Sequence, residues 1–257
     1  MDQVGGQADD QEEEDETGPK RGVLDPVPFG VEEHHCPDAS RDDERDQELS
    51  VAGQPSGVAG AYRRCVSSLS WWLAPHPAWE PDEDWPQAVP VVRYDTDGEV
   101  ALIDPILPLD DSFDPGGKQV TVLLTQPAHY RGTATVVERF DAAVWVPPHA
   151  VWRRRPNPST TTRLPPGVEA IELDGEPQQV VFFVREHATL VSGDVLTGRE
   201  GAMHVFVDEA EPAPLLASLA RIAELPIERV IVPHCETPVF DDGAARIRAA
   251  VAERRSG

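Results

Sequence analysis

Several features are scarce in this chain of 257 residues. Its three cysteines, Cys36, Cys65 and Cys235, show no C-x-x-C spacing, which argues against a disulfide framework or a structural zinc cluster. No apolar run approaches the roughly 18 residues that a membrane-spanning helix needs. The acidic N-terminus also lacks the charged and apolar regions of a secretory signal. These absences predict a reduced, cytoplasmic protein.

Basic residues are also few, and the formal net charge is −24. Only Lys20 and Lys118 are lysines, so arginine supplies the other 20 basic side chains. An acidic field of this size repels nucleic acid and anionic membranes, so neither is an expected partner. The charge is uneven, because the first 50 residues carry a net −13 and the remainder carries −11.

The N-terminal stretch differs in composition from the rest of the chain. Residues 1–58 hold an almost unbroken acidic block from Asp9 to Glu16, surrounded by Gly, Pro, Ser and further charge. Such a segment buries too little apolar surface to offset the entropy lost on ordering. The sequence therefore predicts a disordered acidic tail over 1–58 and one α/β domain over 59–257.

The most informative stretch runs from Gln119 to Thr133. Val120 to Leu124 is a short apolar run that predicts a buried strand, and a polar loop then leads to a helix predicted over Thr133 to Phe140. Proteins of the α/β class place their chemistry in loops of this kind, at the carboxyl ends of strands. The loop is therefore the first candidate for a functional site.

Other apolar runs predict a succession of strands and two more helices. The helices, Pro212 to Leu225 and Asp241 to Arg254, each carry apolar residues on one face. The strands are predicted at Cys65–Leu73, Val91–Tyr94, Val100–Ile103, Ala143–Val146, Val168–Leu173, Val180–Val184, Thr189–Ser192 and Val230–Val232.

Four segments in this order carry a family resemblance. They are Ala101–Pro105, the strand and loop over Gln119–Thr133, Val191–Asp194 and Val232–His234. Together they resemble the metallo-β-lactamase fold over about residues 60–255. The resemblance implies a four-layer αββα sandwich with its metal site at one edge of the sheets.

The first metal-binding motif of that family is Thr-His-x-His-x-Asp-His, and its ligands are replaced here. The two early histidines fall on Gln126 and Ala128, the aspartate on Tyr130, and the last histidine on Arg131. Glutamine is a poor zinc ligand, alanine is none, and an arginine cation opposes a metal cation by Coulomb repulsion. The motif is therefore degenerate.

Elsewhere the resemblance preserves two ligands. The family's middle histidine falls near Gly175, whereas Asp194 and His234 match its metal-bridging aspartate and final histidine. A zinc site needs three or four protein ligands, so two cannot hold a two-metal centre. Arg131 could instead pair with Asp194 in place of the metal charge, or His129 could join Asp194 and His234 in a single-metal site.

Two functions follow from these alternatives. The first is a non-catalytic or strongly diverged member of the fold that binds a small molecule, an anion being one candidate, and needs no cofactor. The second is a hydrolase of an ester, thioester or phosphoester that uses one zinc or iron ion held by Asp194, His234 and His129. A metal-free hydrolase that uses Cys235 or a serine has no supporting G-x-S-x-G elbow in the chain. The predicted pocket is lined by His76, Trp79, Gln126, His129, Tyr130 and Arg131, with His234 beside them.

Overall fold

The structure is a computed structural model. It describes residues 67–75, 88–151, 159–206, 212–235 and 237–256. The predicted tail and the loop that carries His76 and Trp79 lie outside these residues, so both remain predictions.

The first sheet has five strands in the order β1-β2-β3-β4-β5. β1, β2 and β3 form an antiparallel meander, whereas β3, β4 and β5 run parallel. Ile103 pairs with Leu123, so β3 and β4 end at the same edge of the sheet. The strands span Ser68–Pro75, Ala88–Asp95, Glu99–Ile103, Gln119–Leu123 and Ala143–Trp145.

The second sheet has the order β12-β11-β8-β7-β6. β11 and β8 are parallel, so their carboxyl ends also meet at one edge, and the other pairs are antiparallel. In chain order its strands span Val168–Glu172 (β6), Val180–Val184 (β7), Thr189–Val191 (β8), Arg229–Ile231 (β11) and Val239–Asp241 (β12).

A separate hairpin, which the sequence pattern did not predict, follows the second sheet's third strand along the chain. It is formed by β9 (Leu196–Arg199) and β10 (Ala202–Val205). β12 was also missed. All three are short, and a strand of three or four residues leaves too few alternations for its period to be recognised.

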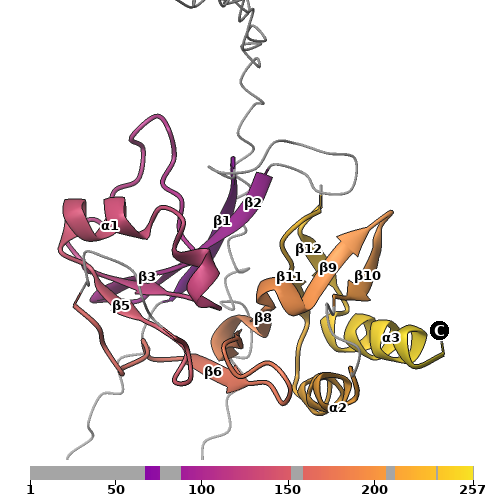
Figure 1. The fold of residues 1–257 in the computed structure, drawn as a ribbon. Coiled ribbons are helices and arrows are strands. Elements are labelled where there is room, and N and C mark those ends of the chain that lie inside the picture. The colour runs from indigo at the N-terminus through magenta and orange to yellow at the C-terminus, as the bar shows by residue number, and fades with distance from the viewer. Residues whose placement is uncertain (1–66, 76–87, 152–158, 207–211, 236, 257) are drawn as a thin grey trace, which may run out of the picture.

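The helices cover the outer faces of the two sheets (Figure 1). α1 (Thr133–Phe140) packs on the first sheet, and α2 (Ala213–Ile222) and α3 (Gly243–Ser256) pack on the second. A third apolar cluster, which includes Ile103 and Phe182, joins the inner faces of the sheets. The architecture is therefore the predicted four-layer αββα sandwich.

The parallel strands of the first sheet are apolar on both faces, because each face meets another layer. Successive side chains alternate between the faces. Val100 and Leu102 of β3 point into the cluster under α1, whereas Ala101 and Ile103 point toward the second sheet. Burial of each Val, Leu or Ile side chain contributes about 1.5–3 kcal/mol. This is why the strands before the site are rigid platforms.

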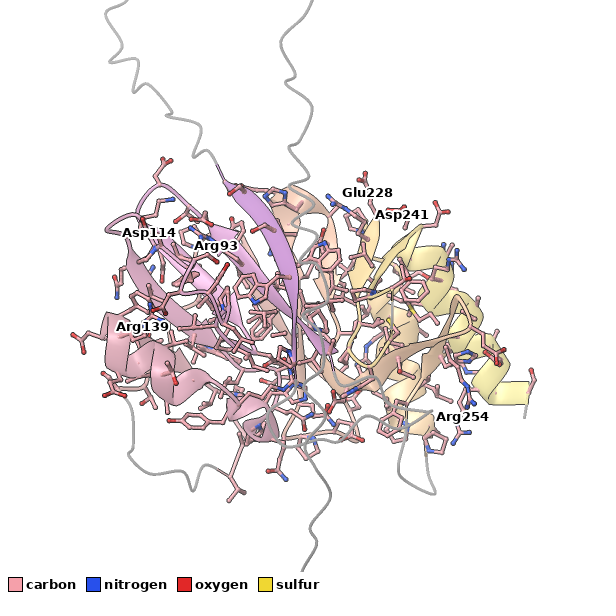
Figure 2. All side chains as sticks on the ribbon, turned by 90° about the horizontal axis from the view of Figure 1, so that it is seen from above. Arg93, Asp114, Arg139, Glu228, Asp241 and Arg254 are labelled. Carbon is pink, nitrogen blue, oxygen red and sulfur yellow. The ribbon has the colours of Figure 1, made fainter. Side chains whose placement is uncertain are left out.

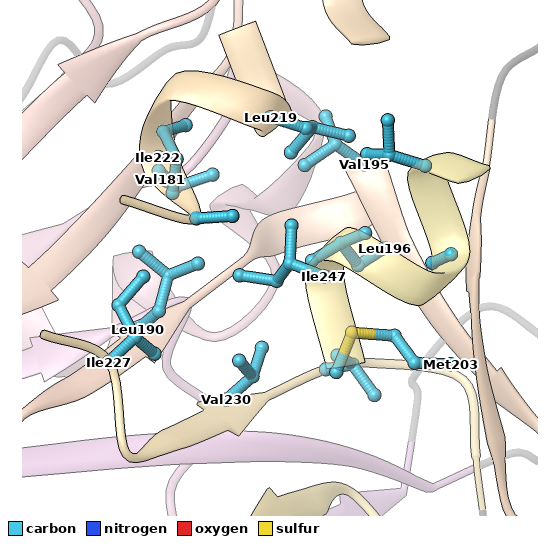
Figure 3. Close-up of a cluster of buried hydrophobic side chains, with 14 of the residues drawn as sticks. Val181, Leu190, Val195, Leu196, Met203, Leu219, Ile222, Ile227, Val230 and Ile247 are labelled. Atoms are coloured by element: carbon cyan, nitrogen blue, oxygen red, sulfur yellow. The ribbon is translucent and has the colours of Figure 1, made fainter. Parts of the chain in front are cut away.

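A comparable core lies between the second sheet and its two helices (Figure 3). Leu219 of α2 and Ile247 of α3 are fully buried there. The predicted stripe of α2, Leu215, Leu219 and Ile222, faces this core. The core fixes β8 and β11, the two strands that lead into the second half of the site.

Charged side chains gather on the outside of both halves (Figure 2). No helix of the described residues is long and apolar enough to cross a membrane. The labelled examples are Arg93, Asp114 and Arg139 on the half that carries α1, and Glu228, Asp241 and Arg254 on the half that carries α3.

Candidate functional site

Four polar residues follow four strand ends at one edge of the sandwich. Asp104 follows β3, Thr125 lies just beyond β4, Asp194 follows β8, and His234 follows β11. Each sheet contributes one parallel pair of strands, so each brings two of these residues together. The side chains of Asp104 and His234 are 7% and 3% exposed, while that of Asp194 is 23% exposed. The cluster is therefore largely buried, with one carboxylate open to one side.

A glycine lets the two halves approach closely. Gly193 has φ +56, and a Cβ at this position would lie 2.9 Å from Cβ of Thr125. Any side chain there would be strained by the backbone and would push the two strand ends apart. Gly193 therefore sets the distance between Thr125 of the first sheet and Asp194 of the second.

Asp104 organises the half of the site that belongs to the first sheet. Its Oδ1 accepts the backbone N–H of Thr125 at 2.9 Å, and its Oδ2 accepts the Thr125 hydroxyl at 2.6 Å. Nδ1 of His129 lies 2.8 Å from the same Oδ2. Asp104 has φ 50, an uncommon backbone conformation that these contacts hold in place.

His129 bridges the two carboxylates. Its Nδ1 faces Asp104, and its Nε2 lies 3.0 Å from Oδ2 of Asp194. Burial alone would lower the pKa of His129, and the nearby Arg131 acts in the same direction. The attraction of Asp104 and Asp194 outweighs both effects and raises the pKa above its ordinary value. Each ring nitrogen of His129 thus faces a carboxylate, and the raised pKa favours the protonated ring.

Asp194 receives contacts on both oxygens. Gln126 Nε2 donates to Oδ2, the same oxygen that His129 faces, and His234 Nε2 lies 3.3 Å from Oδ1. Burial alone would raise the pKa of Asp194, but His129 and His234 hold it well below its usual range. The carboxylate is therefore ionised and held by nitrogen atoms from both sheets.

Arg131 does not pair with Asp194, which was one of the two alternatives for this site. Its Nε and Nη2 are buried and make no hydrogen bond within the part of the chain that the structure describes. Burial lowers the pKa of its guanidinium, although Asp104 and Asp194 act in the opposite direction. The physical reason is that Gln126 and His129 already occupy the oxygen of Asp194 that faces this loop.

The other predicted pocket residues are placed differently. Tyr130 packs into the apolar cluster beneath α1 instead of joining Gln126, His129 and Arg131. Ala128 is exposed in the short helical turn η1 (Pro127–Tyr130) and adds no polar group. The site that the structure assembles is thus smaller and more polar than the predicted pocket.

The donor set does not fit the metal centre of the family. Ala128 and Arg131 provide no ligand, and the amide nitrogen of Gln126 donates to Asp194 where a metal ligand would need a lone pair. Both ring nitrogens of His129 already face carboxylates, so neither is directed at an open metal position. Among the described residues, no group of three or more His, Cys, Asp and Glu side chains is arranged to hold a metal ion.

Asp104 and Thr125 were not predicted as site residues. Both follow the ends of neighbouring strands, and that position was the available signal, since parallel strands end at one edge. In the sequence, Asp104 stands out only as part of a segment that resembles the family. Its role depends on His129 turning back toward it, which the strand pattern does not encode.

The remaining described histidines make contacts away from the site. His187 lies in the turn between β7 and β8 and is partly buried. The thiol of Cys235 donates to the carbonyl of Thr237 at 3.0 Å and packs in the core of the second sheet. The histidine partners are Glu172 for His149, Ser67 for His187 and Glu253 for His204.

Comparison with known proteins identifies the fold. No family profile matches the sequence, and no curated protein matches it. Solved structures do match. DIM-1 metallo-β-lactamase, described as exposed to ceftazidime, is 10% identical with a TM-score of 0.51 over 72% of this chain and 93% of its own. TMB-1 is 11% identical with a TM-score of 0.51, and the match covers 74% of this chain and 94% of TMB-1.

The chain therefore has the metallo-β-lactamase fold. At these identities the likeness shows the fold alone, and the activity of the matched proteins is not transferred by it. Within that fold, this chain carries Gln126, Ala128, Tyr130 and Arg131 where the sequence resemblance places ligands of the first motif.

Proposed function

We propose that this protein binds a small anionic molecule at the site around Asp194 without a metal ion and without hydrolysing it. The observation that carries the proposal is the position of Gln126 and His129. Both direct nitrogen atoms at the carboxylate that bridges metals in the family. An internal cation and an amide thus take the role that a metal charge would have.

The charge of Arg131 supports the same proposal. Its guanidinium lies close enough to Asp104 and Asp194 to interact with both carboxylates. A divalent ion placed at Asp194 would meet Coulomb repulsion from this guanidinium.

An alternative function has one observation in its favour. Nε2 of His129 and Nε2 of His234 lie 3.0 and 3.3 Å from different oxygens of Asp194, so two imidazoles contact one carboxylate, although the described residues hold no group arranged for a metal ion. If the loop that carries His129 shifted, these three groups would be the ligands of a single zinc or iron ion in a hydrolase of esters, thioesters or phosphoesters. This alternative and the proposal differ in metal content.

The experiment is elemental mass spectrometry on the untagged protein after loading with zinc and, separately, with ferrous iron. The matched control is the double variant Asp194→Ala with His234→Ala. We expect wild type and the double variant to carry the same background amount of metal. About one ion per chain in wild type, lost in the double variant, would contradict the proposal and establish the single-metal alternative.

An activity screen adds a second readout. Wild type and the double variant should hydrolyse model esters, thioesters and phosphoesters at equal background rates, with or without added zinc. A rate that is present in wild type and absent in the double variant would overturn the non-catalytic part of the proposal even if no metal were found.

A further inference from the structure

Arg131 has an unusual pattern of unused donors. The two guanidinium atoms that are buried and unpaired are Nε and Nη2. These two N–H groups point to the same side of the planar guanidinium and form its side-on edge. A buried donor without a partner costs about 1–3 kcal/mol, and more when it is charged. Two buried donors without partners beside the candidate site therefore indicate that a ligand accepts their hydrogen bonds.

The backbone holds this edge in a fixed position. Arg131 has φ 27 and ψ −110, a conformation that is costly for a residue with a side chain. Gly132, which follows, donates its N–H to the carbonyl of Pro105 at 2.9 Å. A Cβ on Gly132 would come within 2.8 Å of that carbonyl oxygen, so only glycine permits the contact. The strained residue is thus anchored to the segment that follows Asp104.

The surroundings of Arg131 favour an anion with a single negative charge over one with several. α1 begins directly after Gly132 and has no side-chain cap, and the buried hydroxyl of Thr133 in its first turn also has no hydrogen-bond partner in the described residues. A helix N-terminus attracts an anion. Asp104 and Asp194 lie close enough to act on Arg131, however, and they repel a multiply charged ligand more than a singly charged one.

We infer that the ligand of the site is a carboxylate, bound side-on by Nε and Nη2 of Arg131. Two parallel N–H groups match the two coplanar oxygens of a carboxylate, the geometry in which arginine binds this group most specifically. A single guanidinium flanked by two carboxylates suits a ligand with one negative charge. This inference rests on the proposed function and names the chemical class of its ligand.

The test is an NMR titration of the Nε–H signal of Arg131, assigned by its absence in Arg131→Lys. The probes are acetate, pyruvate and benzoate, each compared with inorganic phosphate and with sodium chloride at equal ionic strength. The expected result is a saturable shift of the Arg131 signal with at least one carboxylate and a weaker response to phosphate. The measurement on wild type stands even if a variant folds poorly.

A second measurement compares dissociation constants by calorimetry. Arg131→Lys keeps the positive charge but removes the planar edge, so the carboxylate should bind at least about tenfold more weakly. Arg139→Lys is the matched control, because Arg139 lies in α1 and pairs with Asp111 on the surface. It should bind like wild type.

Three results would overturn the inference: no saturable shift with any carboxylate, a stronger response to phosphate, or equal affinity in Arg131→Lys. Each of them leaves the metal measurement on Asp194 and His234 unaffected. A stronger response of Arg131 to phosphate would reject a carboxylate as the ligand but would leave the proposed anion-binding function in place. Metal bound by Asp194 and His234 would instead refute the proposed function itself.

Discussion

The two halves of the site differ in how much of the family's metal chemistry they retain. The half from the second sheet keeps an aspartate and a histidine, Asp194 and His234, at the matching positions. The half from the first sheet keeps none of the four first-motif ligands, and a new network of Asp104, Thr125 and His129 has its own hydrogen bonds there. The platform is the same in both halves, because both rest on parallel buried strands.

This difference between the halves indicates which side chains of such a site can be replaced without loss of the fold. The loop after β4 can exchange an exposed side chain such as that of Ala128, whereas His129 and Tyr130 are buried and fixed by their contacts. Asp194 of the second sheet is contacted by His129 and Gln126 of the first. An aspartate at the matching position is therefore not by itself evidence for a metal.

Restoring the lost ligands should have the largest effect, because it should remove the difference in metal ligands between the two halves. The triple variant Gln126→His, Ala128→His and Arg131→His supplies three imidazoles opposite Asp194 and His234. We expect zinc to bind with a dissociation constant of about 1 μM or tighter, equivalent to about 8 kcal/mol. Calorimetry with zinc measures it.

The control for this experiment adds Asp194→Ala to the triple variant, which should abolish most of the affinity. The triple variant itself could fail to bind zinc. That result would show that the shape of the η1 turn, Pro127–Tyr130, prevents metal binding, and that the replaced ligands alone do not explain it.

Removing the carboxylate shared by both halves should have the next largest effect. Asp194→Ala leaves the cation of His129 with one carboxylate partner and leaves Arg131 with less opposing charge. Breaking a buried ion pair in this way costs about 3–5 kcal/mol in the free energy of unfolding. Urea denaturation measures the loss, and Asp241→Ala, at an exposed position of β12, should change stability by less than about 0.5 kcal/mol. Equal losses in the two variants would show that the network does not stabilise the fold.

A smaller effect is expected within the new network alone. Thr125→Val preserves shape but removes the hydroxyl that donates to Asp104 at 2.6 Å and lies 2.8 Å from His129 Nδ1. A buried carboxylate that loses a donor should lower the free energy of unfolding by about 1–3 kcal/mol. Thr135→Val, at an exposed position of α1, is the control for the substitution. A neutral Thr125→Val would indicate that water replaces the hydroxyl.

The smallest expected effect is a change in the free energy of unfolding with pH, which depends on His129 in the half from the first sheet. The pKa of His129 is raised in the folded state. Its contribution to the free energy of unfolding is therefore complete below about pH 6.5 and is lost as the pH rises through the pKa of the folded state. Wild type should therefore lose stability toward alkaline pH, by about 1.4 kcal/mol for each pH unit that separates the unfolded and folded pKa values of His129. The variant His129→Gln should lose less. Urea unfolding measured across this range gives both slopes, and identical slopes would mean that His129 is neutral in the folded protein.

The sequence predicted the platform well. The bounds of α1 and β7 agree with the structure, because β-branched and aromatic runs and a clear helical stripe are local signals. The four-layer order followed from the family resemblance and is confirmed by the fold. The short strands β9, β10 and β12 were missed because their pairing depends on contacts distant in sequence.

Half of the site could be predicted and half could not. Asp194 and His234 follow strand ends, so their positions are fixed by the sheet. The pairing of Arg131 with Asp194, one of the two alternatives, does not form, because the η1 turn places His129 and Gln126 against Asp194 instead. The conformation of a turn of four residues depends on its contacts with Asp104 and Pro105, which sequence spacing does not reveal.

The most direct test of the central claim is the protonation state of His129 at neutral pH. Nitrogen NMR of the assigned imidazole should show both Nδ1 and Nε2 protonated, and adding zinc should leave both signals unchanged. An unprotonated Nε2, or a signal that moves when zinc is added, would contradict the claim that a histidine cation takes the place of the metal charge.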